Sequence, residues 1–431
     1  MDDVLTSDFR ATPYWWEAAP RERIDPVPLP PSADVAIVGA GYTGLAAALM
    51  LARAGRSVAV LEAESAGYGA SSRNAGFIGR TFKKSFGALV ESDGANYAVA
   101  VYRELQSAFD TVVTLIEEEG IECGWRRCGR YIAAASPKHY DSIAQALELK
   151  HRYLGDEFEM VPAAEQHREI GSDTYCGGAV VPDLGSLHPG LYHAGLLRLA
   201  RESGARIVTG TRVNGIRRET RGFGVSTGRG IVFARHVLIA TNGYTTGTTP
   251  WLNRRLVPFR GYMVATEKLP PEQLDRLLPR DRTIHDWHNN LNFMRRSPDG
   301  TRMLMGGLTG SAEKDPARMA RRLHRRYTAL FPDLAAIRLS HSWSGYCAGT
   351  FDFWPHLGEH EGVLYALGYC YAGVPMGTYL GRKAALRIMG ERDAETIFAD
   401  RPFPTVPFYR GGGWFMPAVM KWYDWQDRRS R

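Results

Sequence analysis

Three glycines and one acid have the spacing of a site that could bind a dinucleotide. Gly39, Gly41 and Gly44 follow the pattern G-x-G-x-x-G, and Glu62 lies 23 residues beyond Gly39. In such a pattern the first glycine permits a tight turn, the second lets a pyrophosphate approach the backbone, and the third lets a helix pack closely on its strand. The glutamate would accept hydrogen bonds from an adenosine ribose and would repel a 2′-phosphate. These residues predict a dinucleotide site that disfavours NADP, and they leave FAD and NAD open.

The segments around these residues agree with that interpretation. Asp34 to Val38 is a short apolar run that is typical of a buried strand, and an Ala- and Leu-rich stretch predicts a helix from near Tyr42 to Gly55. Ser57 to Leu61 is a second apolar run, which ends at the acid. Free N–H groups at the start of the helix would face the phosphates. Strand, turn, helix, strand and acid in this order predict a βαβ dinucleotide-binding unit.

Length and charge limit the class of protein. The chain has 431 residues, more than a usual single domain, so two domains are expected. Its 44% hydrophobic and 23% charged residues are typical of an ordinary folded protein. The net charge of +7 comes from scattered arginines, and no aromatic residues interleave with the cluster of Arg321, Arg322, Arg325 and Arg326. We expect that cluster to be a solvated helix face, so no nucleic acid is predicted as a partner.

Cysteine usage and the N-terminus bear on the compartment. Five cysteines without a C-x-x-C pair indicate the cytoplasm and favour ordinary thiols, so no metal site is expected. The first ten residues have neither the basic start nor the apolar stretch of a secretion signal. No window reaches 18 uninterrupted apolar residues, so no membrane partner is expected either.

Two later stretches add to the dinucleotide unit. Val237 to Ala240 is an apolar strand that runs into a small polar turn at Thr241 to Gly243, and residues 363–368 form another apolar strand. A glycine turn and a helix over about 376–389 follow the second strand, some 330 residues after the first unit. Strand-like segments between them, at 130–135, 174–181, 256–267 and 302–307, predict an inserted sheet. A nucleotide fold split in this way favours an FAD-binding oxidoreductase over an NAD dehydrogenase, whose nucleotide domain is normally contiguous.

Two segments have less regular compositions. Residues 67–79, GYGASSRNAGFIG, are too rich in Gly and Ser for regular structure. Their polar groups could follow a cofactor inward from the pyrophosphate, and a plain surface loop is an equally good interpretation. Residues 1–32 are predicted to be an extended arm in which the prolines, including Pro26 to Pro31, exclude regular helix and strand. We expect Trp15 and Trp16 in this arm to pack against the body of the protein.

Seven stretches resemble a known family, the FAD-dependent amine and amino-acid oxidoreductases that include D-amino-acid oxidase, glycine oxidase and sarcosine oxidase. The similarity extends over almost the whole chain, and it is greatest to the γ-glutamylputrescine oxidase branch. The stretches are PYWWEAAP (13–20), VAIVGAGYTGLAAAL (35–49), GASSRNAG (69–76), VLIATNGYT (237–245), WSGYCAGTFDFWPHLG (343–358), GYCYAGVPMGTYLGRKAA (368–385) and the aromatic tail at 403–427.

The resemblance implies a mixed α/β (α+β) fold with a Rossmann-like FAD-binding domain and an inserted substrate domain built on a mostly antiparallel sheet. The implied domains are an arm at 1–32, a discontinuous FAD domain at 33–90, 185–245 and 340–395, a substrate domain at 91–184 and 246–339, and a tail at 396–431. The residues expected to bind FAD are Gly39, Gly41, Tyr42, Thr43, Gly44, Glu62, Ala63, Ser71, Ser72, Arg73, Asn74, Ala75, Gly76, Val213, Thr241, Asn242, Gly243, Gly345, Gly373, Val374, Pro375 and Met376.

The resemblance also implies a reaction, which is oxidation of a C–N bond by hydride transfer from an amine to flavin N5. The partners would be a primary or secondary amine, or an amino acid, and molecular oxygen or another electron acceptor. Candidate residues for the substrate are Tyr371 in the last glycine turn, Arg260 for a substrate carboxylate, Tyr262 and Tyr346. For each aromatic residue, a place in the core is the alternative, and for Arg260 an exposed or structurally paired arginine is an equally good interpretation.

Two departures from the family pattern affect these expectations. The family's GYSGHG turn is here GYCYAG, so its His is replaced by Ala372 and a bulky Tyr371 is added, which favours a different substrate. Ser344 stands where monomeric sarcosine oxidases have the cysteine that links the flavin, so noncovalent FAD is expected. The alternative functions are an FAD-containing RNA-modifying or assembly protein and an NAD-linked dehydrogenase.

Overall fold

The structure is a computed structural model that describes residues 4–22 and 27–429. Pro26 of the predicted proline-rich stretch lies outside the described residues, as do the ends of the predicted arm and tail. Within the described ranges, the larger of the two main sheets has nine strands. Its order is β1 (Leu5–Arg10), β17 (Leu339–Thr350), β13 (Leu256–Thr266), β16 (Met303–Gly307), β15 (Phe293–Arg296), β14 (Thr283–Asp286), β5 (Arg130–Ala133), β7 (Gly178–Val181) and β6 (Glu159–Val161).

The second main sheet contains the predicted βαβ unit. Its strands, in the same described ranges, are β10 (Val213–Glu219), β11 (Gly222–Thr227), β12 (Gly230–Ile239), β2 (Ser32–Val38), β3 (Val58–Leu61) and β9 (Arg206–Val208), with β19 (Val363–Leu367) beside β12 and β18 (His356–His360) beside β19. Strands β12, β2, β3 and β9 run parallel, and so do β12 and β19. A small third sheet pairs β4 (Phe77–Ile78) with β8 (Gly185–Ser186).

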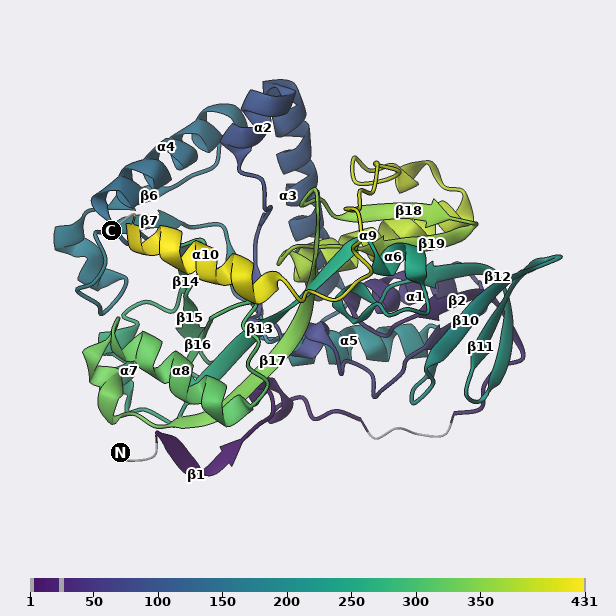
Figure 1. The fold of residues 1–431 in the computed structure, drawn as a ribbon, viewed down its shortest axis with the longest axis horizontal. Coiled ribbons are helices and arrows are strands. Elements are labelled where there is room, and N and C mark those ends of the chain that lie inside the picture. Colours follow the sequence, from purple (N-terminus) through teal and green to yellow (C-terminus); the bar gives the residue numbers. More distant parts are fainter. Residues whose placement is uncertain (1–3, 23–26, 430–431) are drawn as a thin grey trace.

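Helices cover one face of the parallel strands and flank the nine-stranded sheet (Figure 1). They are α1 (Tyr42–Arg53), α2 (Phe86–Asp93), α3 (Ala95–Glu118), α4 (Pro137–Leu154), α5 (Pro189–Glu202), α6 (Pro250–Asn253), α7 (Pro271–Leu277), α8 (Pro316–Thr328), α9 (Gly373–Met389) and α10 (Met416–Arg429). Short 3₁₀ turns are η1 (Tyr14–Trp16), η2 (Ala70–Ser72), η3 (Ala163–Arg168), η4 (Asn242–Tyr244), η5 (Pro332–Ala336) and η6 (Arg392–Ala394).

The predicted fold class is confirmed. Strands β2 and β3 with α1 between them form the Rossmann-like unit, and β12 and β19 with α9 add its distant part. In the nine-stranded sheet only β1 with β17 and β14 with β5 pair in parallel, so that sheet is mostly antiparallel. Its strands come from two separate stretches between pieces of the first unit, as expected for inserted segments.

Two elements pack with a different domain from the one to which the predicted domain limits assign them. Strand β17 falls within the segment assigned to the FAD domain, yet it pairs with β13 in the nine-stranded sheet. Helix α3 falls within the segment assigned to the substrate domain, yet its apolar face packs with α1, α5 and α9 in one core. Both differences arise because strand pairing and helix packing join segments that are distant in the chain, which local sequence patterns do not mark. The remaining domain limits stay predictions.

The expectation that the arm has no regular structure is wrong. Residues Leu5–Arg10 form β1 and pair with β17, because these residues precede the prolines and keep the N–H groups that a strand needs. The expected packing of the two tryptophans is confirmed. Trp15 is fully buried and its Nε1–H donates to the carbonyl oxygen of Asn74 at 2.8 Å, while Trp16 Nε1–H donates to Ser72 Oγ at 2.8 Å. The arm therefore fastens the glycine- and serine-rich loop.

The arginine cluster on α8 is only partly a solvated face. Arg325 is exposed, but Arg322 Nη1 donates to Ser311 Oγ at 2.9 Å and Arg326 Nη2 donates to the Asn290 carbonyl oxygen at 3.0 Å. The prediction missed these contacts because their partners lie in distant loops. These two arginines hold loops at one side of the nine-stranded sheet.

We predict that Trp15→Ala lowers the free energy of unfolding by about 3–5 kcal/mol, because it empties a fully buried site and removes the hydrogen bond to Asn74. Urea unfolding of the flavin-free protein, followed by far-UV circular dichroism, measures the change. Trp422→Ala is the matched control, since Trp422 is 53% exposed and should change stability by no more than about 0.5 kcal/mol. Equal stability of the two variants would contradict the anchoring role of Trp15.

Candidate functional site

A cavity of about 1480 Å³ connects the βαβ unit with the nine-stranded sheet. It is larger than the roughly 300–1,000 Å³ of a usual small-molecule site. One end is formed by the turn after β2 and the start of α1, and the other by β13, β17 and the turn before α9. The cavity therefore has room for an extended dinucleotide and a second, smaller molecule.

Packing explains the glycines at the dinucleotide end. Gly39 has φ +107°, and a Cβ there would lie 3.0 Å from the carbonyl oxygen of Ala240. A Cβ on Gly44 would lie 1.9 Å from the carbonyl oxygen of Gly39, so no other residue lets α1 begin so close to β2. A Cβ on Gly41 would meet only Ser71 Oγ, at 3.0 Å, and Gly41 lines the cavity. Two glycines therefore serve the fold, and the third leaves backbone open to a ligand.

The start of α1 is suited to an anion. The N-cap residue, Gly41, has no side chain to cap this helix, and the Tyr42 N–H donates to Ser71 Oγ at 3.1 Å. The exposed N–H groups and the positive end of the helix dipole attract phosphate. Thr43 Oγ1 and the hydroxyl of Tyr369 lie 2.7 Å apart, which links α1 to the turn before α9.

Glu62 lies at the end of β3 and lines the cavity. Its Oε2 accepts from the Ala40 N–H at 2.8 Å, and its Oε1 accepts from the Glu64 N–H at 3.0 Å. These bonds fix the carboxylate, and burial raises the pKa of Glu62 above its ordinary value. A carboxylate oxygen can accept a second hydrogen bond, so both oxygens remain able to bind ribose hydroxyls.

The glycine- and serine-rich loop lies along the cavity. Arg73 Nε donates to the Tyr68 carbonyl oxygen at 2.7 Å, and its Nη1 donates to the Ser344 carbonyl oxygen at 3.1 Å on β17. Asn74 Nδ2 donates to the hydroxyl of Tyr42 at 3.2 Å. The loop thus joins α1 to the nine-stranded sheet, and its place beside the cavity favours the cofactor interpretation over a plain surface loop.

The structure brings most of the predicted cofactor residues to this cavity. Those that line it are Gly39, Gly41, Tyr42, Thr43, Glu62, Ala63, Ser71, Arg73, Asn74, Ala75, Val213, Thr241, Asn242, Gly243, Gly345, Gly373 and Val374. Those that stand behind its wall are Gly44, Ser72, Gly76, Pro375 and Met376.

Two of the residues behind the wall have clear structural partners. Ser72 Oγ donates to the Gly67 carbonyl oxygen at 2.5 Å and accepts from Trp16. A Cβ on Gly76 would lie 2.2 Å from the carbonyl oxygen of Leu187, so this glycine permits a close backbone contact. Both residues therefore shape the loop.

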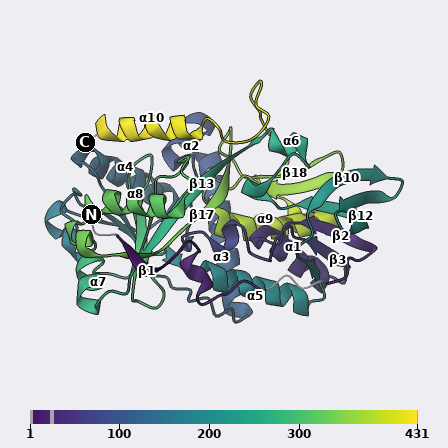
Figure 2. The same ribbon diagram turned by 60° about the horizontal axis from the view of Figure 1, so that its bottom comes forward.

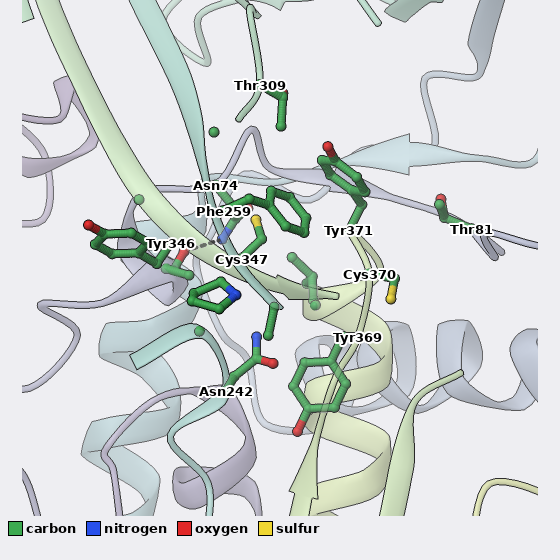
Figure 3. A pocket seen from close by; sticks show the side chains of 18 of the residues that line it. Asn74, Thr81, Asn242, Phe259, Thr309, Tyr346, Cys347, Tyr369, Cys370 and Tyr371 are labelled. Atoms are coloured by element: carbon green, nitrogen blue, oxygen red, sulfur yellow. Dashed lines mark hydrogen bonds between the residues drawn. The ribbon is translucent and has the colours of Figure 1, made fainter. Parts of the chain in front are cut away.

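The four substrate candidates divide between the two faces of the β13–β17 ribbon. Consecutive strand residues point to opposite faces, so Phe259 and Arg260 diverge, as do Tyr346 and Cys347. Tyr371 joins Phe259, with ring centroids 5.2 Å apart. Figure 3 shows Tyr346 pointing away from Phe259, Cys347 and Tyr371. All of these residues line the cavity, which therefore wraps around this end of the ribbon.

Arg260 and Tyr346 form a polar pair on their face of the ribbon. Arg260 Nη2 donates to the Tyr346 hydroxyl at 2.8 Å. Burial acts to lower the pKa of Arg260, but the interactions with Tyr346 and Tyr262 together outweigh it and raise that pKa. No carboxylate pairs with Arg260 among the described residues, so its charge is available to an anionic group.

Tyr262 has a structural role, unlike Arg260 and Tyr346. It is buried, and its hydroxyl lies 2.6 Å from the Ser311 carbonyl oxygen and 2.8 Å from the Glu313 carbonyl oxygen. Burial raises the pKa of Tyr262. The hydroxyl is committed to the 308–315 loop, so Tyr262 positions that loop at the cavity wall.

Tyr371 occupies the turn between β19 and α9. Cys370 and Tyr371 have φ values of +45° and +79°, a conformation that is uncommon for residues other than glycine. Hydrogen bonds hold the turn: the Cys370 N–H donates to the Ala348 carbonyl oxygen at 3.1 Å, and the Gly368 N–H donates to Asn242 Oδ1 at 2.9 Å. Strained backbone of this kind collects at functional sites, and here it points the phenol into the cavity.

Sequence reasoning missed several residues of the cavity wall. Lys150 on α4 lines it beneath the ring of Tyr102, and burial lowers the pKa of Lys150 to about 8. The C-terminal tail also contributes, from Gly412 to Pro417. No local signal marks these residues, because each reaches the cavity only through packing against elements far away in the chain.

Other features of the described residues limit the chemistry. All five cysteines are free. No group of three His, Cys, Asp or Glu side chains in residues 4–22 and 27–429 could hold a metal ion. No helix in the same ranges is long and apolar enough to cross a membrane.

Comparisons with known proteins agree with this geometry. The chain is similar to the probable oxidoreductase OrdL of Haemophilus influenzae, with 28% identity over 87% of each chain, and to the gamma-glutamylputrescine oxidoreductase of Escherichia coli, with 29% identity over 87% of this chain and 88% of the relative. The crystal structure of glycine oxidase from Geobacillus kaustophilus superimposes with a TM-score of 0.73 and 26% identity, over 88% of this chain and 99% of that one. The family described as FAD dependent oxidoreductase matches residues 34–387. The chain therefore belongs to the DAO family of FAD-dependent oxidoreductases.

Proposed function

We propose that this protein oxidises the C–N bond of a primary or secondary amine, or of an amino acid, and releases the corresponding imine. The observation that carries this proposal is a single cavity that joins an anion-binding helix start to an aromatic wall. Bound FAD would supply the hydride acceptor, its N5 atom. If oxygen reoxidises the flavin, hydrogen peroxide is the second product.

The residues of the wall suit an uncharged amine. Phe259 and Tyr371 line the cavity next to the turn before α9, and Tyr346 lines it on the opposite face of the β13–β17 ribbon. An apolar surrounding disfavours the ammonium form and so favours the free amine, which is the form that loses hydride. Arg260 is placed to pair with a substrate carboxylate, which would orient an amino acid.

Two relatives support an amine substrate. The similar proteins include the gamma-glutamylputrescine oxidoreductase of Escherichia coli and the glycine oxidase of Geobacillus kaustophilus. Tyr371 and Ala372 depart from the family pattern in the turn that faces the cavity. We infer that the preferred amine differs from those of the named relatives. We also infer noncovalent FAD, since Ser344 cannot form a thioether.

The earlier alternatives fare differently. Because the chain belongs to an FAD-dependent family, the alternative of an NAD-linked dehydrogenase is not proposed. An RNA-modifying or assembly role would leave the amine test negative and would show RNA binding that falls steeply with salt. The cytoplasm remains the predicted compartment.

We predict that an amine bleaches the flavin of the purified, FAD-loaded protein under anaerobic conditions. The panel is sarcosine, glycine, putrescine derivatives and N-methylated amino acids, followed by visible absorbance. Fast return of the flavin colour after air is admitted identifies an oxidase. Slow return of the colour identifies a dehydrogenase. A fully loaded sample that no amine bleaches would contradict the proposed reaction.

We predict that Gly41→Asp weakens FAD binding by at least about tenfold, because a carboxylate at this position would repel the pyrophosphate by about 4 kcal/mol at 4 Å near a protein surface. The measurement is the flavin content of the purified variant and its Kd for added FAD. Gly228→Ala is the control, since Gly228 lies in open space away from the cavity. Normal flavin content in Gly41→Asp would contradict the proposed pyrophosphate site.

We predict that Tyr371→Gly changes the relative rates of flavin reduction across the amine panel by about tenfold, the scale of a changed pocket contact. Phe353→Gly is the control, because Phe353 is also a half-exposed aromatic residue with a positive φ, of +62°, but lies outside the cavity. If the relative rates stay the same in Tyr371→Gly, this residue does not select the substrate.

A further inference from the structure

The C-terminal tail forms part of the cavity although it lies beyond residues 34–387, which match the family. Its contribution comes from Gly412, Gly413, Trp414, Met416 and Pro417, at the start of α10. Figure 2 shows α10 as an outer layer along the top edge of that view. The tail therefore lies outside the residues that the family model matches, and it reaches the site itself.

Close packing joins the tail to β13 and to the loop after β16. A Cβ on Gly413 would lie 2.1 Å from the carbonyl oxygen of Pro258, the residue before Phe259. A Cβ on Gly310 would lie 2.5 Å from Met420 Cγ on α10. The tail thus rests directly on the backbone that carries the aromatic wall.

Two carboxylates on α10 hold the loop that connects β14 and β15. Asp427 Oδ1 accepts from the Asn289 N–H at 3.0 Å and from Asn289 Nδ2 at 2.8 Å, and its Oδ2 accepts from the Asn290 N–H at 3.2 Å. Asp424 Oδ1 accepts from Asn290 Nδ2 at 3.1 Å. Asp427 is only 7% exposed, so these charge-assisted bonds lie largely away from water.

The same loop connects the tail with the substrate candidates. Asn290 Oδ1 accepts from the Thr309 N–H at 3.2 Å. Thr309 lies in the cavity wall, and Figure 3 shows the hydroxyl end of Tyr371 turned towards it. The two α10 carboxylates therefore set the position of a wall that continues to Tyr371.

Several apolar side chains of the cavity wall remain exposed. Trp287 and Leu291 are each 36% exposed, Tyr371 is 46% exposed and Trp414 is 80% exposed, and all four line the cavity. Exposed apolar surface in the wall of a cavity indicates a binding site. An apolar ligand group would cover these side chains.

We propose that residues 412–427 are a specificity element, which selects amines that carry an apolar substituent and packs that substituent against Trp414, Trp287 and Leu291. This inference rests on the proposed amine oxidation and adds the substrate class. Asp424 and Asp427 are positioning residues, because they hold the wall and do not face the ligand.

The test uses ethylamine, butylamine and hexylamine with the FAD-loaded full-length protein under anaerobic conditions. The Kd of each amine is measured from the change in flavin absorbance, which reports binding with or without bleaching. In the unmodified protein the Kd should fall by about fourfold per buried methylene. The dependence should flatten in Trp414→Ala and in the double variant Asp424→Asn/Asp427→Asn, while flavin content stays normal.

Two further variants separate specificity from general damage. Gly413→Ala should displace the tail from Pro258 without altering an apolar side chain, and should flatten the dependence in the same way. Lys421→Gln, an exposed site on the same helix, should leave it unchanged. Limited trypsin digestion should cut the tail faster in the Asp double variant and in Gly413→Ala, and at the normal rate in Trp414→Ala.

The outcomes distinguish this proposal from the proposed function. Alkylamines that bind with the expected dependence and never bleach the flavin would support the wall and contradict the oxidation. A Kd that does not depend on chain length, or that keeps the same dependence in every variant, would overturn the specificity element. Absence of any alkylamine effect on the flavin spectrum would also overturn it.

Discussion

The contact between Gly39 and Gly44 leaves no room for a side chain, and the rest of the site depends on it. Because a Cβ on Gly44 would lie 1.9 Å from the Gly39 carbonyl oxygen, α1 can begin directly beside the end of β2. The start of α1, whose N-cap is a glycine, then opens into the cavity, where its N–H groups and dipole attract phosphate. The close packing of α1 on β2 therefore brings the helix start to the position where it can bind phosphate.

The loop after β3 is held from two directions, and this links the two sheets. From the arm, Trp15 and Trp16 donate to Asn74 and Ser72. From β15, Arg295 Nη1 donates to the carbonyl oxygens of Leu187, at 2.8 Å, and Gly76, at 3.3 Å. Arg295 is almost fully buried, and burial lowers its pKa to about 10, so its bonds to carbonyl oxygens offset an otherwise costly charge. A loop fastened in this way can hold a cofactor at a constant position relative to the substrate wall.

The β13–β17 ribbon controls what can face that cofactor. Strand alternation puts Phe259 and Cys347 on one face and Arg260 and Tyr346 on the other, so the charged Arg260 and the ring of Phe259 act on different sides of the ribbon. The tail rests on the carbonyl oxygen of Pro258 in β13 and is bound through Asp427 to the β14–β15 loop. An enzyme of this design can change its substrate by altering a turn and a tail, while the βαβ unit stays the same.

The sequence by itself determined the βαβ unit, its distant completion near β19 and α9, the mixed fold class and the FAD family. These depend on local patterns: apolar runs of strand length, glycines at fixed spacing, and motifs such as GASSRNAG that lie within one short segment. Most of the residues expected at the cofactor do line the cavity, because neighbours in such a motif are also neighbours in space.

Only the tertiary structure decided how the substrate side is assembled. Pairing of β1 with β17, the division of Arg260 from Tyr371, and the contact of Asp427 with Asn289 join residues that are far apart in the chain. No local preference of those residues points to their partners, since strand register and helix docking are set by packing over the whole core. The sequence therefore determines which cofactor chemistry the protein carries, and the packing of distant segments decides which groups surround its substrate.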